Sequence, residues 1–308
     1  MKAVVVGASG FIGSHLVDAL LAQGSQVRAL SRHLPGLITA KAQDHPGLVL
    51  HPLDMADRLG LEQALVGSEI IFHLASGSLP QSSNRNPRED ININVLGALN
   101  LLEASLEVGI QKFVFVSSGG TVYGIPKQVP IAENHPTDPI CSYGITKLAI
   151  EKYVSLYRHL YGLNSTVVRL ANPYGERQRL DSCQGVVPVF LNRALRSEPL
   201  EIWGDGSTIR DFLYITDVVQ ALLAISHYKG SENLFNVGSG IGLSLRELVK
   251  LIENELGRPL QVSYQPTRSF DVPTNVLSIK RARNCLGWSP KVCATDGIHR
   301  FHQSLLGH

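Results

Sequence analysis

Two side chains near the middle of the chain have the types and the spacing needed for proton transfer. Tyr143 and Lys147 lie four residues apart in the segment YGITK, and on a helix this spacing places both side chains on one face. A free tyrosine titrates near pH ~10, which is too high for a good base at neutral pH. A neighbouring ammonium, and a second positive charge on a bound group, would favour the phenolate. The pattern therefore predicts that Tyr143 exchanges a proton with a substrate hydroxyl, with Lys147 as its partner.

The hydroxyl-rich segment SSGGTVYG follows directly after the apolar run FVFV. In open α/β sheets, ligands bind at the loops that follow the carboxyl ends of the strands. We expect Ser118 or Thr121 to polarise a substrate oxygen, and Ser117 and Gly119 to lie beside the bound groups. The alternative interpretation is a turn whose hydroxyls serve only its own backbone.

The segment GASGFIG at the start of the chain has the composition of a phosphate-binding loop. Gly7, Gly10 and Gly13 are spaced by three and follow the first apolar run. Glycine allows a tight turn and a close approach of the backbone to a pyrophosphate. The helix that begins at Phe11 and Ile12 would offer N–H groups and a partial positive charge to that anion. We predict that this loop binds a dinucleotide.

The residues after the second and third predicted strands bear on which dinucleotide is bound. Ser31 and Arg32 stand where an acidic residue would accept hydrogen bonds from the adenosine ribose. A hydroxyl beside a guanidinium is better suited to a 2′-phosphate, so NADP is favoured over NAD, unless Arg32 is only a solvated or adenine-stacked residue. Asp54 is a candidate to bind the adenine amino group, or else a turn or helix-capping residue.

Short apolar runs alternate with amphipathic stretches through the first half of the chain. The predicted strands are Ala3–Val6, Gln26–Leu30, Leu48–Leu50, Ile70–Leu74, Lys112–Ser117 and Ser165–Leu170, and the predicted helices are Ile12–Ala22, Leu61–Leu65, Ile93–Glu107 and Tyr143–Leu160. This alternation implies βαβ units, and uninterrupted apolar strands imply cover on both faces. The predicted fold is α/β, a Rossmann-type doubly wound parallel sheet.

From Asn172 onward, turn residues are denser and the predicted helices are shorter. We expect these helices at Val187–Leu195, Thr216–Ile225 and Ser244–Leu256, and one more strand at Leu234–Val237. Residues 1–172, joined by about 212–238, are expected to form a dinucleotide-binding domain. Residues 173–308 are expected to form a smaller, interleaved α/β substrate-binding domain.

Composition excludes several classes of function. The 308 residues are 44% hydrophobic and 18% charged, with a net charge of +2, which gives no electrostatic case for a nucleic-acid partner. No apolar run reaches the ~18–20 residues that cross a bilayer, and the start does not resemble a signal peptide. The four cysteines form no CxxC pair and the histidines show no metal-binding spacing. We expect a cytoplasmic protein without a membrane partner or a metal.

Taken together, the motifs resemble the extended short-chain dehydrogenase/reductase family, and most closely its UDP-glucose 4-epimerase-like branch. The resemblance runs nearly end to end and is carried by GASGFIG, FHLAS (72–76), NVLGALNLLEA (94–104), SSGGTVYG, SYGITK, RLANPYG (169–175), GDGSTIRDFLYITDV (204–218), FNVGSG (235–240) and LGWSP (286–290). The family uses a tightly bound NAD or NADP and acts on sugars linked to a nucleoside diphosphate.

The resemblance also implies roles for individual positions. It makes Tyr143 the catalytic base and Lys147 its partner. The further residues expected beside the cofactor are Leu74, Ala75, Ser76, Asn94 and Leu170. Those expected at the substrate are Ser78, Asn172, Arg210, Arg268 and Asp271, the arginines at its phosphates. Two long helices, Ile93–Glu107 and Tyr143–Leu160, resemble the pair that joins a homodimer in this family, with Leu96, Leu99, Leu148 and Tyr153 as either core or interface residues.

Two departures from the family pattern keep alternatives open. Many members carry a hydroxyl residue where this chain has Gly119, and many epimerases carry aspartate where it has Ser31. The leading hypothesis is a 4-epimerase of a UDP-hexose that acts through a transient 4-keto sugar. The first alternative, favoured by Ser31 and Arg32, is an NADPH-dependent reductase of a nucleotide-linked 4-keto-6-deoxy sugar. A 4,6-dehydratase is less favoured because Gly119 and Gly120 occupy the acid/base positions, and a non-catalytic dinucleotide-binding protein is disfavoured by Tyr143 and Lys147.

Overall fold

A seven-stranded parallel sheet forms the larger part of the molecule, which a computed structural model describes for residues 1–77, 80–180, 185–267 and 272–306. The strands follow the order β10-β6-β5-β4-β1-β2-β3, and every neighbouring pair is parallel. They are β1 (Lys2–Val6), β2 (Gln26–Ser31), β3 (Leu48–Pro52), β4 (Ile70–His73), β5 (Lys112–Ser118), β6 (Ser165–Leu170) and β10 (Leu234–Val237). The predicted strands and the predicted parallel sheet are confirmed, with ends that differ by one or two residues.

The apolar strands are buried on both faces, which explains why their sequences do not alternate with polar residues. Along β1, Ala3 and Val5 pack into one core, and Val4 and Val6 pack into a second core on the opposite face. All four are at most 3% exposed. A polar residue at any of these positions would therefore lose its contact with water.

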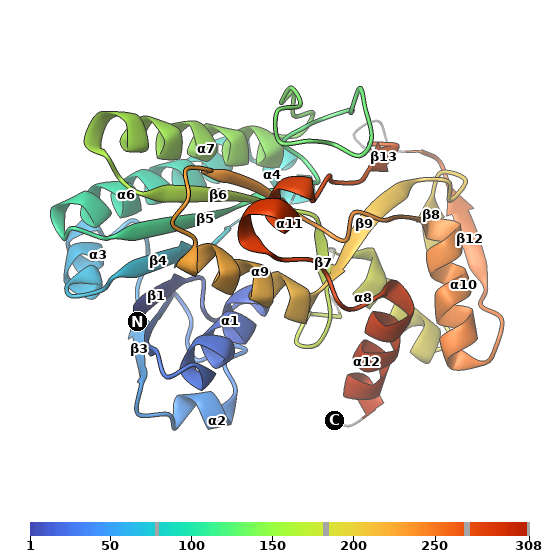
Figure 1. The fold of residues 1–308 in the computed structure, drawn as a ribbon. Coiled ribbons are helices and arrows are strands. Elements are labelled where there is room, and N and C mark those ends of the chain that lie inside the picture. Colours follow the sequence, from blue (N-terminus) through green and yellow to red (C-terminus); the bar gives the residue numbers. More distant parts are fainter. Residues whose placement is uncertain (78–79, 181–184, 268–271, 307–308) are drawn as a thin grey trace.

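Helices cover both faces of the sheet, as the doubly wound prediction requires (Figure 1). One face carries α1 (Phe11–Ala22), α2 (Ala40–Gln43) and α9 (Ile215–His227), and the other carries α3 (Arg58–Leu65), α6 (Gly97–Glu107) and α7 (Ser142–Tyr161). Between β4 and α6 the chain forms α4 (Pro80–Arg85), α5 (Pro87–Asp90) and a π-helical turn, η1 (Ile91–Leu96). The sequence analysis missed α2, α4 and α5, because helices of four to six residues are too short to show a periodic pattern.

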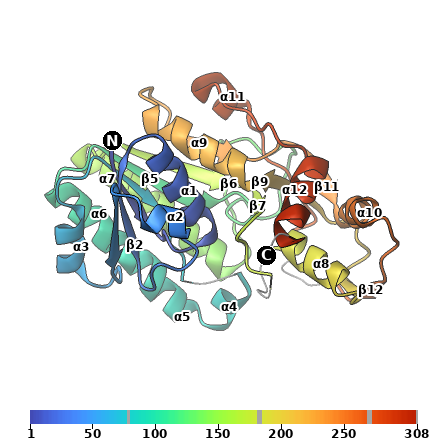
Figure 2. The same ribbon diagram turned by 90° about the horizontal axis from the view of Figure 1, so that it is seen from below.

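The second half of the chain adds two small sheets and three helices at one end of the large sheet, and a fourth helix, α11, that packs against β10 and α9 (Figure 2). The strands are β7 (Asn172–Tyr174), β9 (Ile209–Tyr214), β11 (Gly242–Ser244) and β13 (Thr274–Asn275) in one sheet, and β8 (Leu200–Trp203) and β12 (Val262–Gln265) in the other. The helices are α8 (Val186–Leu195), α10 (Leu245–Leu256), α11 (Lys280–Leu286) and α12 (Ala294–Leu306). The predicted helices near 187, 216 and 244 are confirmed, whereas these strands, α11 and α12 were missed.

Two buried carboxylates tie the later segments to the rest of the fold. Asp211 in β9 is fully buried and accepts hydrogen bonds from the backbone N–H groups of Ser239, Gly240 and Leu277. Asp217 in α9 accepts hydrogen bonds from the backbone N–H groups that precede α12, those of Lys291 and Val292. These donors come from segments that lie later in the chain. Each carboxylate therefore holds a later segment against β9 or α9.

The strand order places a crevice at a predictable point. The chain leaves β1 towards α1 on one face of the sheet, whereas the segment after β4 leads to α6 on the other face. Ligands in such sheets bind at the carboxyl ends of the strands where this switch occurs. None of the helices in the described part of the chain combines the length and apolar character needed to cross a bilayer.

Candidate active site

A cavity of about 1200 Å³ opens at the carboxyl ends of β1, β2, β4, β5 and β6 and extends to β8 and β9. This exceeds the roughly 300–1,000 Å³ of a typical pocket for one small molecule. Most residues predicted for the site line it: Gly7, Gly10, Phe11, Ile12, Gly13, Ser31, Arg32, Asp54, Leu74, Ala75, Ser76, Ser117, Ser118, Thr121, Tyr143, Lys147, Leu170, Asn172 and Arg210. Residues from distant parts of the sequence thus meet in one space.

Two predicted residues do not line this cavity. Asn94 is 3% exposed, and its side chain bonds the backbone of Gly77 and Asp90 instead. A Cβ atom on Gly119 would lie 2.6 Å from Leu277 Cδ1, so this position faces the core and has no room for the hydroxyl that many family members carry there. Three further predicted residues lie outside the described part of the chain: Ser78, Arg268 and Asp271.

The glycine loop has the geometry that its sequence predicts. Gly7 has φ +88°, and a Cβ there would lie 2.7 Å from the backbone nitrogen of Ala75. A Cβ on Gly13 would lie 2.2 Å from the carbonyl oxygen of Gly7. Among the described residues, no side chain caps the start of α1, so the N–H groups of its first turn are available to an anion. These features fit the pyrophosphate of a dinucleotide.

A polar cluster lies at the end of the cavity nearest β2. Ser31 accepts a hydrogen bond at its Oγ from the Ser9 N–H, at 3.2 Å, and so supports the glycine loop. Arg32, His33 and Asp54 line the cavity beside it. His33, which the sequence analysis did not single out, adds a second nitrogen-bearing side chain next to Arg32.

The start of the helix that carries Tyr143 is held by another helix. Cys141, at the N-cap position of α7, makes no side-chain capping bond. Instead, Ser83 and Asn84 of α4 accept hydrogen bonds from the N–H groups of Tyr143 (2.9 Å) and Ser142 (2.8 Å). These bonds satisfy donors that a helix start leaves free, and they fix the backbone of Tyr143.

Tyr143 and Lys147 both face the cavity from α7. The Lys147 ammonium lies 5.7 Å from the centroid of the Tyr143 ring and donates a hydrogen bond to the Val116 carbonyl oxygen at 3.1 Å. The Tyr143 phenol is hydrogen-bonded to the side chain of Ser76. The predicted one-face arrangement is thus present, with the lysine beside the ring.

In the protein by itself, burial opposes ionisation of the Tyr143 phenol, and the predicted effect of Lys147 together with a positive bound group stays a prediction. Burial raises the pKa of Tyr143 to about 12, and the charge of Asp90 adds to the rise while the Ser76 hydrogen bond opposes it. Burial also lowers the pKa of Lys147 to about 8. Desolvation dominates because both side chains are enclosed, so a base at neutral pH requires a further positive charge from a bound group.

The hydroxyls expected to hold a substrate oxygen lie at the cavity. Ser118 and Thr121 line the same cavity as Tyr143. Thr121 Oγ1 is buried and has no hydrogen-bond partner within the described ranges. Gly144 brings α7 close to this loop, since a Cβ there would lie 3.0 Å from the Thr121 carbonyl oxygen. Thr121 is therefore poised to bind a polar atom of a ligand.

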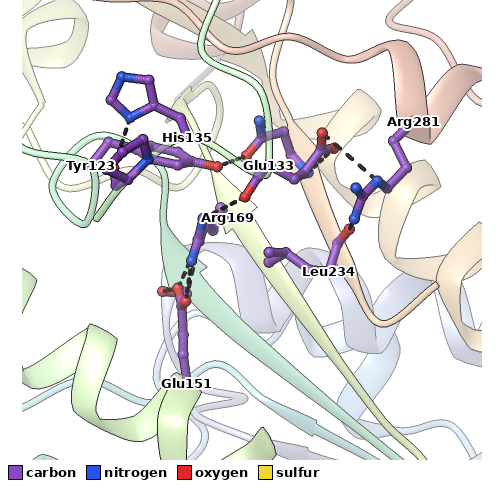
Figure 3. A network of polar contacts seen from close by, with 10 residues as sticks. Tyr123, Glu133, His135, Glu151, Arg169, Leu234 and Arg281 are labelled. Atoms are coloured by element: carbon purple, nitrogen blue, oxygen red, sulfur yellow. Dashed lines mark hydrogen bonds and ion pairs between the residues drawn. The ribbon is translucent and has the colours of Figure 1, made fainter. Parts of the chain in front are cut away.

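A buried ion pair lies behind the cavity-lining residue Ser117 (Figure 3). Arg169 of β6 and Glu151 of α7 are 5% and 6% exposed, and their charged atoms are 2.7 Å apart. Figure 3 shows the Arg169 guanidinium between the Glu151 carboxylate and the main chain of Glu133, to whose oxygen it also donates. Glu151 in turn accepts a hydrogen bond from the hydroxyl of Ser117, which lines the cavity. The pair therefore joins β6 to α7, the helix that carries Tyr143 and Lys147.

We predict that Arg169→Met lowers the free energy of unfolding by about 3–5 kcal/mol, because it leaves the Glu151 carboxylate buried and unpaired. Urea denaturation measures this loss. The double variant Arg169→Met/Glu151→Gln should regain a large part of it. Arg58→Met, which removes an exposed pair with Glu103, is the matched control and should cost far less. A loss for Arg169→Met no larger than for Arg58→Met contradicts the prediction.

The far end of the cavity is built by the second half of the chain. Arg210 of β9 donates to the carbonyl oxygens of Ile209 and Val272, and Asn172 donates to that of Asp211 at 3.0 Å. Trp203 also lines this end, as do Gln178, Gly185 and Phe190. The sequence analysis missed Trp203 and Gln178. The signal for Trp203 was the short segment LEIW before a glycine turn, which is rich in apolar residues apart from Glu201.

Comparison with known proteins agrees with this geometry. Residues 3–238 match the NAD dependent epimerase/dehydratase family. A UDP-glucose 4-epimerase of Mycolicibacterium smegmatis is 39% identical, with 97% of this chain and 96% of that protein covered. A dTDP-4-dehydro-6-deoxyglucose reductase of Escherichia coli is 32% identical, with 98% and 96% covered.

Solved structures show the same fold. The UDP-glucose 4-epimerase of Thermotoga maritima, determined with UDP-glucose, superposes with a TM-score of 0.93 at 35% identity and covers 100% of this chain and 99% of that one. The Thermus thermophilus UDP-glucose 4-epimerase, in complex with NAD, superposes with a TM-score of 0.91 at 33% identity and the same coverage.

Proposed function

The chain belongs to the NAD dependent epimerase/dehydratase family, and from this premise we propose that it is a nucleotide-sugar 4-epimerase of the UDP-glucose/UDP-galactose type. The observation that carries the proposal is that one cavity is lined by the glycine loop, by Tyr143 and Lys147, and by Arg210. A dinucleotide, a proton-transfer group and a sugar diphosphate can thus meet in one space. We assign dinucleotide binding to residues 1–172 with about 212–238, and substrate binding to the rest of 173–308.

The residues around the glycine loop fit NAD or NADP. The first turn of α1 would hold the pyrophosphate, and Asp54 and Arg32 would hold the adenosine. The nicotinamide would lie towards Tyr143 and Lys147, beside Leu74, Ala75 and Leu170. When bound, the dinucleotide supplies a group that accepts a hydride from the sugar and returns it.

Tyr143 would take the proton from the 4-hydroxyl of the sugar as the hydride leaves, and would give it back after the sugar has turned. Thr121 and Ser118 would hold the sugar oxygen during the transient 4-keto stage, a role that the unpartnered Thr121 Oγ1 supports. Lys147 would keep a positive charge beside the tyrosine. One acid/base group serves both half-reactions because each is the reverse of the other on opposite faces of the sugar.

The substrate would be held by its diphosphate and not by its sugar. Arg210 and Asn172 at the far end of the cavity are the described residues suited to the phosphates, and we keep Arg268 and Asp271 as candidates from the sequence. Anchoring through the diphosphate leaves the sugar ring free to rotate between the two hydride transfers. We also keep Ser78 as a candidate for the sugar pocket.

The test uses the purified protein with no added coenzyme. Denaturation followed by mass spectrometry identifies any released dinucleotide, and incubation of the native protein with UDP-glucose or UDP-galactose tests for interconversion. The proposal expects both a released dinucleotide and interconversion of the two sugars. Absence of interconversion in protein that holds a stoichiometric dinucleotide overturns it.

A second candidate is an NADPH-dependent reductase of a nucleotide-linked 4-keto-6-deoxy sugar. The observation that favours it is the cluster of Ser31, Arg32 and His33 at the adenosine end, which suits a 2′-phosphate. Consumption of NADPH with a 4-keto sugar, without interconversion of UDP-hexoses, would favour this candidate.

We predict that Arg32→Ala weakens NADP binding about 10- to 100-fold and changes NAD binding much less, because a charged hydrogen bond is worth about 1.5–3 kcal/mol. Calorimetric titration of dinucleotide-free protein measures both affinities. Ser31→Asp should disfavour NADP further by placing a negative charge beside the 2′-phosphate. Equal losses of NAD and NADP affinity in Arg32→Ala contradict the preference for NADP.

We further propose a homodimer formed through α6 and α7. Leu96 and Tyr153 are 50% and 38% exposed, which supports an interface role for these two residues. Leu99 and Leu148 instead pack against the chain's own cores.

A further inference from the structure

A buried carboxylate lies beside the first turn of the catalytic helix, outside the motifs discussed so far. Asp90, the last residue of α5, is 2% exposed. Its oxygens accept hydrogen bonds from Thr146 Oγ1 at 2.7 Å, Asn94 Nδ2 at 2.8 Å and Ser142 Oγ at 3.0 Å. Three side-chain donors from two elements thus converge on this one carboxylate.

The hydrogen bonds of Asn94 fix which end of its amide faces Asp90. The Gly77 N–H donates to Asn94 Oδ1 at 2.9 Å, so the amide nitrogen of Asn94 must face Asp90. Gly77 itself lines the cavity. Asn94 therefore links a cavity loop to the carboxylate, which explains its burial better than direct contact with a ligand does.

The two α7 hydroxyls that donate to Asp90 belong to the residues that directly precede Tyr143 and Lys147. Ser142 precedes Tyr143, and Thr146 precedes Lys147. Because both hydroxyls are held by one carboxylate, the rotation of the first helical turn about its axis is fixed. Tyr143 and Lys147 are then held towards the cavity.

The charge of Asp90 also acts on this pair. The charged and titratable groups around the pair are His73 of β4, Arg85 of α4, Asp90 of α5, Glu151 of α7, Arg169 of β6 and Cys141 before α7. Among them, Glu151 is paired with Arg169. His73 is enclosed, and burial lowers its pKa to about 3, so it carries no charge near neutral pH. Asp90 is thus the main negative charge acting on the pair.

We propose that Asp90 is a positioning residue for proton transfer, which fixes the first turn of α7 and whose negative charge keeps Lys147 protonated and opposes ionisation of Tyr143. In agreement, the charge of Asp90 raises the pKa of Lys147 against the stronger effect of burial, and it adds to the raised pKa of Tyr143. The inference rests on the proposed epimerase function for its kinetic readout only.

The test is the pH profile of kcat/KM for UDP-hexose interconversion by Asp90→Asn. The amide keeps the shape and removes the charge, so both limbs of the profile should move to lower pH, by about one unit. Thr146→Val, which removes one donor but leaves the charge, should lower kcat without moving the limbs. Asp217→Asn is the matched control, since it neutralises another buried carboxylate away from the catalytic helix and should lower stability only.

A second readout does not depend on the reaction. In protein labelled with ¹³C at lysine Cε, the Lys147 signal is identified by its absence in Lys147→Met, and its titration midpoint, expected near pH 8, is followed by NMR. Asp90→Asn should lower this midpoint. If Asp90→Asn does not fold, Asp90→Ser provides a smaller neutral side chain with the same expectation.

The pH profile and the Lys147 titration together separate the proposed epimerase function from the proposed role of Asp90. An inactive wild-type protein whose Lys147 midpoint falls on neutralisation of Asp90 overturns the proposed function but supports the role of Asp90. In a protein that interconverts UDP-hexoses, a pH profile that Asp90→Asn leaves unmoved overturns the role of Asp90. An unmoved Lys147 midpoint overturns that role whether or not the protein is active.

Discussion

Tyr143→Phe should lower kcat/KM for UDP-hexose interconversion by about 10²–10⁴-fold, the usual contribution of a positioned acid or base. The reason is that Tyr143, the residue proposed to exchange the proton, lines the cavity beside the Lys147 ammonium. The phenyl ring of the variant keeps the contact with Lys147, so the protein should still fold and bind dinucleotide.

The measurement compares turnover with the dinucleotide content of the same sample. Tyr157→Phe is the matched control, because Tyr157 lies on the same helix but packs against the core behind the sheet. It should leave turnover unchanged. Retained turnover in Tyr143→Phe would show that another group moves the proton.

The protonation of Tyr143 adds a condition to this prediction, namely that the dinucleotide is bound. Without ligands, burial raises the pKa of Tyr143 to about 12, so few molecules carry the phenolate at neutral pH. The positive charge of a bound nicotinamide is expected to lower that pKa. The enzyme is therefore expected to bind its dinucleotide before it can take a proton from the sugar.

Gly13→Ala should weaken dinucleotide binding by at least about 100-fold. The added Cβ would lie 2.2 Å from the Gly7 carbonyl oxygen and 2.8 Å from the Ala8 Cα, both backbone atoms that no side-chain rotation can remove. The loop must therefore shift by about 1 Å, and a misplacement of that size costs on the order of 10²-fold at a positioned site. Gly10→Ala, with a contact at 3.3 Å, should have a smaller effect.

Titration of dinucleotide-free protein measures these affinities, and circular dichroism checks the fold. Gly67→Ala is the control for a general effect of replacing glycine. It has φ +73° with nothing within 4 Å of the added atom, so it should cost about 1–2 kcal/mol of stability without changing dinucleotide affinity. Normal binding by Gly13→Ala would mean that the pyrophosphate does not lie on this loop.

The parallel sheet could be predicted because its inner strands, such as β1, β4 and β5, are buried on both faces. Val4 and Val6 pack into one core while Val5 packs into the other, which gives the uninterrupted apolar runs seen in the sequence. The strands of the two small sheets give no such signal. For example, β9 includes Arg210 and the buried Asp211, and its partners β7, β11 and β13 come from distant segments.

The same distinction applies to the site. Glycine spacing predicted the loop geometry, and the spacing of Tyr143 and Lys147 predicted their common face, because both patterns are local in the sequence. Asp90 could not be found in that way, since its role depends on donors from η1 and α7. Desolvation also depends on the whole fold, so the rise that burial causes in the pKa of Tyr143 could not be predicted from the spacing of the two residues.

A crystal structure of the protein with its dinucleotide and UDP-glucose tests the central claim most directly. We expect the pyrophosphate against the first turn of α1, and the sugar 4-hydroxyl within about 3 Å of the Tyr143 oxygen on the nicotinamide side of the cavity. A pyrophosphate bound away from residues 7–13, or a sugar ring out of reach of Tyr143, would contradict the account.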